Sequence, residues 1–166
     1  MTTEAEQGAG ATAVLPYGAV MTELAALDAD RIALVCDGPN GSEAFTRAEL
    51  DAWANRLARS YVELGLRHGD YATVALPNCP EFFAERANPT LVIGVAEGSY
   101  ESRVCVPADL KVEHYSPEPL PAQTSPHERA MASGGSTGLP KLIVAANSAV
   151  YDPQQASPLF KGRHAV

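Results

Sequence analysis

The sequence predicts an α/β protein, and three observations support this prediction. Short β-branched and apolar runs, such as residues 32–36 and 91–95, have the length of strands. Residues 50–64 carry apolar side chains at the three- and four-residue spacing of an amphipathic helix. Strand-like and helix-like segments alternate along the chain, an order typical of α/β architectures.

The composition excludes several classes of protein. The 166 residues carry a formal net charge of −8, without the clustered Lys and Arg that nucleic-acid binding requires, so no nucleic-acid partner is expected. Cys36, Cys79 and Cys105 form no C-x-x-C pair, and an odd count argues against a disulfide framework. A reducing, cytoplasmic location is therefore expected.

The sequence also lacks the features of a metal site, of a signal peptide and of a membrane span. The four histidines lack metal-ligand spacing, so no metal site is predicted. The N-terminal residues are acidic and polar, unlike a signal peptide. The longest apolar runs are too short for a membrane span.

The N-terminal third begins with an aperiodic segment and then becomes regular. Residues 1–17 show no periodicity and are expected to form a flexible arm, followed by one domain over residues 18–166. Residues 19–27 predict a short helix with Val20, Leu24 and Leu27 on one face. The run at 32–36, the turn residues 37–41 and the return at 44–45 predict a β-hairpin.

The second predicted helix has a defined start and end. Thr46 and Glu49 have the spacing of a capping box, in which each side chain accepts from an otherwise unpartnered backbone N–H group. Gly65 suits the left-handed position that follows a helix. The side chains expected to pack this helix are Leu50, Trp53, Leu57, Tyr61 and Leu64.

The remaining elements are shorter. Residues 71–76, 91–95 and 104–106 are predicted strands, and residues 81–83 are expected to start a short helix. Residues 107–126 contain five prolines and no periodicity, which predicts an extended connector. Residues 130–133 and 141–145 are predicted strands on either side of a glycine-rich loop, and residues 151–166 an unstructured tail.

The glycine-rich loop is the segment that indicates chemistry. Its glycines allow close backbone approach to a ligand, successive backbone N–H groups form an anion-binding concavity, and hydroxyl groups and one lysine add donors and a positive charge. These groups suit a polyphosphate. The candidate binding residues are Ser133, Gly134, Gly135, Ser136, Thr137, Gly138 and Lys141.

Two common phosphate motifs do not fit this loop. A P-loop places its lysine at the start of a helix, whereas Pro140 precedes Lys141 here and a strand-like run follows. The same strand-like run excludes the dinucleotide-binding fingerprint. A glycine-rich hairpin without any ligand remains the plain alternative.

Residues 132–141 resemble the phosphate-binding loop of the adenylate-forming superfamily, whose pattern is Ser/Thr-Ser-Gly-Ser/Thr-Thr-Gly-x-Pro-Lys. The superfamily includes acyl-CoA synthetases, aryl-CoA ligases, luciferases and peptide-synthetase adenylation domains. Residues 45–51 and 64–82 also resemble its N-terminal scaffold segments. The resemblance covers residues 19–83 and 130–144.

The resemblance implies a partial N-terminal domain of the adenylate-forming fold, with strands alternating with helices and an irregular C-terminal part. It also implies an ATP-dependent carboxylic acid–CoA ligase, in which an acid and ATP with Mg give an acyl-adenylate and CoA then forms the thioester. The implied partners are a small carboxylic acid, ATP and CoA.

The chain also departs from the family. Gly134 replaces the usual serine, a form similar to that of a branch of acid–CoA ligases. Only residues 84–90 bridge segments that family members separate by further helices, so an internal deletion is expected. After Lys141 the sequence lacks the family's aromatic-Gly-x-Thr-Glu motif, its Thr-Gly-Asp motif and its C-terminal lysine.

No catalytic residue and no metal ligand can therefore be assigned. We expect the chain to be a truncated N-terminal AMP-binding domain that is inactive as it stands. Two alternatives remain open: a small nucleotide- or phosphate-binding module, and a non-catalytic remnant without a ligand.

Overall fold

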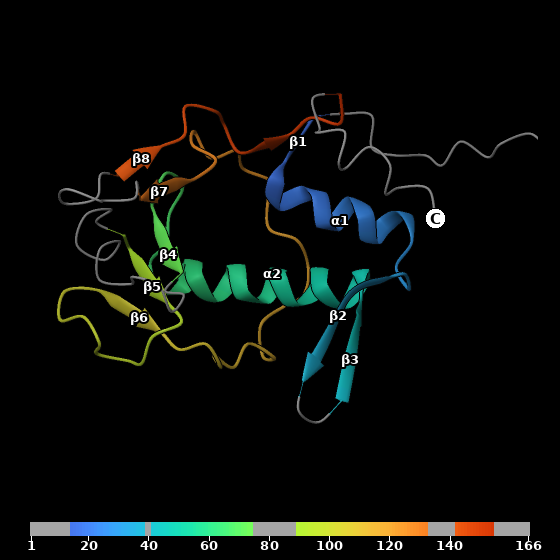
Figure 1. Ribbon diagram of the computed structural model, residues 1–166, viewed down its shortest axis with the longest axis horizontal. Helices are drawn as coiled ribbons and strands as arrows, with labels where there is room; N and C mark the ends of the chain where they lie inside the picture. The colour runs from blue at the N-terminus through green and yellow to red at the C-terminus, as the bar shows by residue number, and fades with distance from the viewer. Residues whose placement is uncertain (1–13, 39–40, 75–88, 133–141, 155–166) are drawn as a thin grey trace, which may run out of the picture.

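The computed structural model describes residues 14–38, 41–74, 89–132 and 142–154. Two antiparallel helices lie side by side at its centre, and a three-stranded sheet lies at the C-terminal end of the second helix (Figure 1). Three two-stranded sheets complete the described fold. The element order is β1, α1, β2, β3, α2 and then β4 to β9. Mixed helices and strands confirm the predicted α/β class in its broad sense.

The alternation predicted from the sequence holds only in the first half of the chain. Among the described residues no helix follows α2. Strands β5 (Leu91–Ile93) and β6 (Val104–Val106) are parallel, yet turns at residues 94–103 connect them. Gly94 and Gly98 adopt φ values of 90° and 76° in this connection, a region that glycine enters without steric cost.

The start of the chain is more ordered than the sequence predicted. Strand β1 (Leu15–Pro16) pairs antiparallel with β9 (Val150–Tyr151), and helix α1 (Tyr17–Leu27) begins directly after β1. The flexible arm expected for residues 1–17 is therefore wrong for its last three residues, and the unstructured tail expected from residue 151 is wrong for Tyr151. Residues 1–13 and 155–166 lie outside the described structure.

The predicted hairpin is confirmed and is longer than expected. Strand β2 (Ile32–Gly38) pairs antiparallel with β3 (Gly41–Thr46), with a register shift between Ile32 and Leu34. The hairpin projects away from the rest of the chain beside the start of α2 (Figure 1).

Helix α2 (Arg47–Glu63) confirms the predicted ends. The Thr46 hydroxyl accepts from the Glu49 backbone N–H at 3.2 Å, and a Glu49 carboxylate oxygen accepts from the Thr46 backbone N–H at 2.8 Å. At the other end, Gly65 has φ 105°. Its N–H donates to the Val62 carbonyl and the Leu66 N–H to the Tyr61 carbonyl, which together form a Schellman motif.

The packing expected around α2 is correct only in part. Leu50, Leu57 and Tyr61 are partly buried, but Trp53 is 53% exposed and Leu64 is also exposed. The helix instead packs against α1, where the Thr22 hydroxyl donates to Asp51 Oδ1 at 2.7 Å and Arg47 Nη1 donates to the Leu24 carbonyl at 3.2 Å. Two hydrogen bonds thus link the helices across their interface.

The apolar core lies in the parallel sheet. Strand β5 is central, between β4 (Ala72–Val74) and β6. The buried hydrophobic residues are Leu91, Val92, Val106 and Val112. Each predicted strand of this region is present in its described part, while residues 75–88, which include the helix start predicted at 81–83, lie outside the described structure. No described helix is long and apolar enough to cross a membrane.

Replacing Thr46 with Ala should lower the free energy of unfolding by about 1 kcal/mol, because one backbone donor of α2 loses its partner. Thr46→Ser keeps the hydroxyl and should retain most of that stability. Urea unfolding followed by far-UV circular dichroism gives both values. Equal stabilities for the Ala and Ser variants would contradict the cap.

The capping box also predicts a pH dependence. The hydrogen bond from the Thr46 backbone N–H, and then that from its side chain, lower the pKa of Glu49 below the usual 4.5. Its stabilisation is therefore fully present above the unfolded-state pKa and is lost as the pH falls through the lower folded-state pKa. Thermal unfolding between pH 6 and pH 3 should show a smaller loss of stability for Glu49→Gln than for the wild type.

Two glycines should respond to Ala in opposite directions. Gly65→Ala should destabilise by about 1 kcal/mol because its φ is positive. Gly18→Ala lies in α1 with nothing near a built Cβ, and should stabilise by up to about 1 kcal/mol. The same unfolding series measures both, and a destabilising Gly18→Ala would contradict the assignment of α1.

Candidate phosphate-binding loop and adjoining cleft

The predicted loop lies between two strands that pair with each other. Strands β7 (Ala130–Ala132) and β8 (Leu142–Val144) are antiparallel, with Ala132 opposite Leu142. Both predicted strands are thus confirmed. Antiparallel pairing holds the two ends of the intervening loop at the spacing of neighbouring strands, about 5 Å.

All seven candidate binding residues lie outside the described residues, so their geometry stays a prediction. They are Ser133, Gly134, Gly135, Ser136, Thr137, Gly138 and Lys141. The structure supplies the strands on either side of them and the surface next to these strands.

Two further contacts lengthen the β7–β8 hairpin below the loop. The Ala145 N–H donates to the Arg129 carbonyl at 2.9 Å, and the Glu128 N–H donates to the Asn147 carbonyl at 2.8 Å. Met131 and Ile143 face each other across the strands and are 50% and 54% exposed. One face of the hairpin is therefore apolar and uncovered by the described residues.

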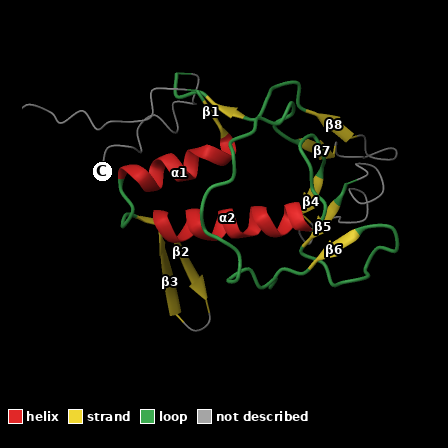
Figure 2. Ribbon diagram, turned by 180° about the vertical axis from the view of Figure 1, so that it is seen from behind, coloured by secondary structure: helices red, strands yellow, loops and turns green. Residues whose placement is uncertain are grey.

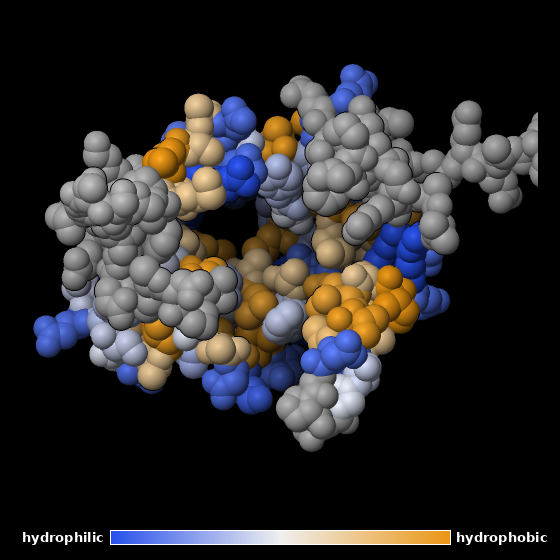
Figure 3. All heavy atoms as spheres, viewed as in Figure 1, coloured by the Kyte–Doolittle hydropathy of each residue, from blue (hydrophilic) through white to orange (hydrophobic). Residues whose placement is uncertain are grey.

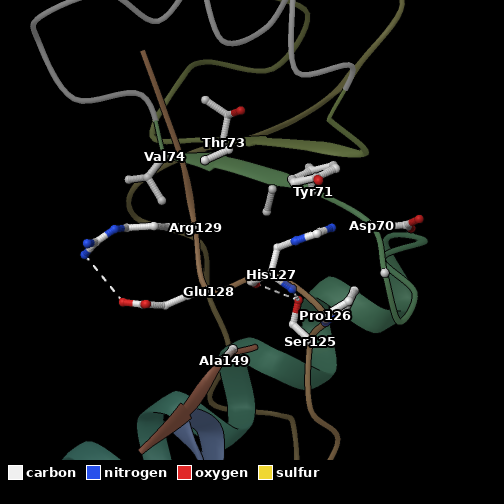
Figure 4. Close-up of a pocket in the computed structure, with 13 residues that line it drawn as sticks. Asp70, Tyr71, Thr73, Val74, Ser125, Pro126, His127, Glu128, Arg129 and Ala149 are labelled. Atoms are coloured by element: carbon white, nitrogen blue, oxygen red, sulfur yellow. Dashed lines mark hydrogen bonds and ion pairs between the residues drawn. The ribbon is translucent and has the colours of Figure 1, made fainter. Parts of the chain in front are cut away.

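A cleft of about 350 Å³ lies between β4 and the segment that leads into β7 (Figure 4). One wall comes from residues 69–74 and the other from residues 125–130, with Ala149 at one side. Thr73, on the β4 wall, is buried. Segments more than 50 residues apart in sequence therefore form one concave surface that reaches the first residue of β7.

Hydrogen bonds fix the second wall of the cleft. The Ser125 hydroxyl donates to the His127 carbonyl at 2.9 Å, and His127 Nδ1 lies 2.9 Å from the Ala145 carbonyl oxygen. That carbonyl accepts, so Nδ1 carries the hydrogen and Nε2 is the acceptor of the neutral ring. The imidazole is thus held to the end of β8.

The charges of the cleft partly cancel. Arg129 forms an ion pair with Glu128, with 3.4 Å between Nη1 and Oε1 (Figure 4). The Asp70 carboxylate, on the opposite wall, accepts from the Arg67 backbone N–H at 2.9 Å. A mixed lining with an internal ion pair is suited to a polar ligand of low net charge rather than to a polyphosphate.

The cleft does not hold the arrangement of a metal site or of a nucleophile and base. Within the described ranges no group of three His, Cys, Asp or Glu side chains could bind a metal ion. Sequence reasoning missed the cleft because residues 69–74 resemble only scaffold segments and His127 lacks a spaced partner, so nothing local indicated that residues 69–74 and 125–130 meet.

Comparison with known proteins gives two related enzymes over part of the chain. Triostin synthetase I of Streptomyces triostinicus is 43% identical, and 2,3-dihydroxybenzoate-AMP ligase of Bacillus subtilis is 39% identical, each over 67 residues. These matches cover 40% of this chain but 12% of each relative. No protein-family model matches the sequence.

Both relatives are adenylate-forming ligases, so the comparison supports the superfamily resemblance. Neither relative is named as a CoA ligase. The similarity therefore supports acid activation with AMP and leaves the acyl-CoA assignment as a proposal.

Proposed function

We propose that this chain is part of an ATP-dependent ligase that activates a carboxylic acid by adenylation. The observation that carries the proposal is a Ser-Gly-Gly-Ser-Thr-Gly-Leu-Pro-Lys loop on an antiparallel hairpin, in a chain similar to two adenylate-forming ligases. A glycine-rich hairpin without a ligand does not require three hydroxyl groups in its loop together with a lysine directly before the second strand.

In the proposed reaction a carboxylate oxygen attacks the α-phosphorus of ATP, and the bond from that phosphorus to pyrophosphate breaks. The acyl-adenylate then passes its acyl group to a thiol, and AMP leaves. We propose CoA as the thiol, because the glycine at position 134 is similar to that of a branch of acid–CoA ligases.

The loop contributes charge stabilisation and positioning. Backbone N–H groups and the hydroxyl groups of Ser133, Ser136 and Thr137 would donate to the β- and γ-phosphate oxygens, and Lys141 would offset their negative charge. Magnesium, bound with the triphosphate, would neutralise further charge. Transfer at the α-phosphorus depends mainly on such positioning.

The 166 residues do not supply the rest of this site. After Lys141 there is no Thr-Gly-Asp segment for the ribose and no aromatic-Gly-x-Thr-Glu segment for magnesium. We therefore propose that this polypeptide alone binds phosphates and does not adenylate. The second candidate function is that of a small phosphate-binding module. In that case the loop would bind phosphates in the same way, but the chain would not be part of a ligase.

The 166-residue protein should show no ATP–pyrophosphate exchange with any carboxylic acid. A misplacement of reacting groups by about an ångström can cost about a hundredfold in rate, and here nothing fixes the adenosine end. Exchange above that of heat-denatured protein would overturn the proposed lack of activity.

Binding of ATP, GTP and pyrophosphate should be weak, similar among the three, and strongly weakened by salt, because only phosphates are contacted. Isothermal titration at low and at physiological ionic strength measures this. Lys141→Ala should weaken binding further, whereas Lys111→Ala removes the same charge from the exposed connector and serves as the matched control. A clear preference for ATP over GTP would show that an adenine site is present.

A further inference from the structure

The connector at residues 107–126 follows a fixed path although it contains no helix and no strand. It crosses helix α2 on its way from the sheet to the β7–β8 hairpin (Figure 2). Val112 is buried, so the connector is anchored at its start by an apolar side chain. Prolines at 117, 119 and 121 remove backbone donors, which leaves this stretch unable to form a ladder.

One arginine of α2 satisfies three carbonyl groups of the connector. Arg59 Nε donates to the Ser116 carbonyl at 3.1 Å, and Arg59 Nη2 donates to the Glu118 carbonyl at 2.8 Å and, more weakly, to that of Pro119 at 3.5 Å. A planar guanidinium with five donors suits such a cluster, whereas a lysine ammonium would hold fewer of these carbonyls at once.

Neighbouring side chains of the same helix add to this contact. Arg56 Nε donates to the Tyr115 carbonyl at 3.3 Å, one helical turn before Arg59. The Tyr115 phenol donates to the Glu63 carboxylate, which raises the pKa of the phenol. Residues 56, 59 and 63 are three and four apart, so they lie on one face of α2 and follow the connector along the helix. Beyond the helix end, His68 Nε2 lies 2.9 Å from the Thr124 carbonyl oxygen.

The hairpin that carries the predicted loop depends on this path. Among the described elements, β7 and β8 pack chiefly against each other and share little contact with any other helix or strand. Their position is therefore set by the chain on either side. The connector fixes the β7 side, while Ala149, whose N–H donates to the Ser125 carbonyl at 3.0 Å, links the β8 side to β1 and β9.

We infer that Arg59 is a positioning residue for the candidate phosphate-binding hairpin. By holding the connector on α2, Arg59 fixes where β7 starts and how the β7–β8 pair lies against β4 across the cleft. The inference rests on the proposed function, because phosphate binding by the loop is the property that the position serves.

Pyrophosphate binding in three variants tests this inference. Arg59→Ala should raise the Kd for pyrophosphate at low salt by about tenfold, since charge-assisted contacts to the connector are lost. Arg59→Lys should fall between Arg59→Ala and the wild type. Arg67→Ala is the matched control, because Arg67 has the same charge and its side chain, among the described residues, donates to the Val62 and Leu66 carbonyls beside it. Its Kd should change by no more than about twofold.

Backbone hydrogen exchange separates positioning from general destabilisation. In Arg59→Ala the Ala145 and Ala149 N–H groups should exchange faster, while those of β5 keep the wild-type rate. Equal Kd values for Arg59→Ala and Arg67→Ala would overturn the inference, and so would exchange that rises equally in β5. Absence of pyrophosphate binding in the wild type would refute the proposed function itself, and the inference with it.

Discussion

Backbone carbonyl groups of the proline-rich connector are bound by arginine side chains of α2, and this contact holds the connector against the helix. Arg56 and Arg59 together donate hydrogen bonds to four carbonyl groups of the connector, those of Tyr115, Ser116, Glu118 and Pro119. A proline-rich segment loses little conformational entropy on ordering, so a few charge-assisted hydrogen bonds are enough to hold it. The helix thus provides the hydrogen-bond donors along which the connector lies.

The same helix connects both halves of the protein. Its N-terminal end adjoins the β2–β3 hairpin and α1, and its C-terminal end leads through the Gly65 turn into the wall of the cleft. Thr46, Glu49 and Gly65 define where this helix starts and stops. Residues 69–74, which follow this turn, form one wall of the cleft, and residues 125–130 form the other.

Short-range chemistry in this protein is readable from the sequence, and long-range pairing is not. The capping box and the glycine turn involve residues within six positions of each other, so the pattern of Thr46, Glu49 and Gly65 was sufficient. The strands at 91–93 and 104–106 could be recognised as apolar runs, but their parallel pairing through turns could not, because such connections usually contain a helix. Exposure of Trp53 was unforeseen since amphipathic spacing does not say what covers a face.

In the candidate site, too, the local structure could be predicted from the sequence and the long-range contacts could not. The two strands around the glycine-rich loop follow from local propensity and were predicted correctly. The cleft beside them joins residues 69–74 and 125–130, which lie far apart in the sequence, so no local pattern indicated that they meet. The hydrogen bonds that hold the connector go to its backbone groups, which carry no residue-type signature in the sequence.

The β2–β3 hairpin has a consequence for how copies of this protein behave together in solution. Within the described residues each of its strands has one edge without a partner. Ile32, Leu34 and Val35 are exposed on the hairpin, where apolar side chains gather at the surface (Figure 3). Such edges are templates for pairing between molecules. Asp37 and Glu43 place negative charge on the same hairpin, and the isoelectric point is about 4.9. Acidification toward that value removes the overall net charge that keeps copies of the protein apart, so colloidal stability should fail there before the fold does.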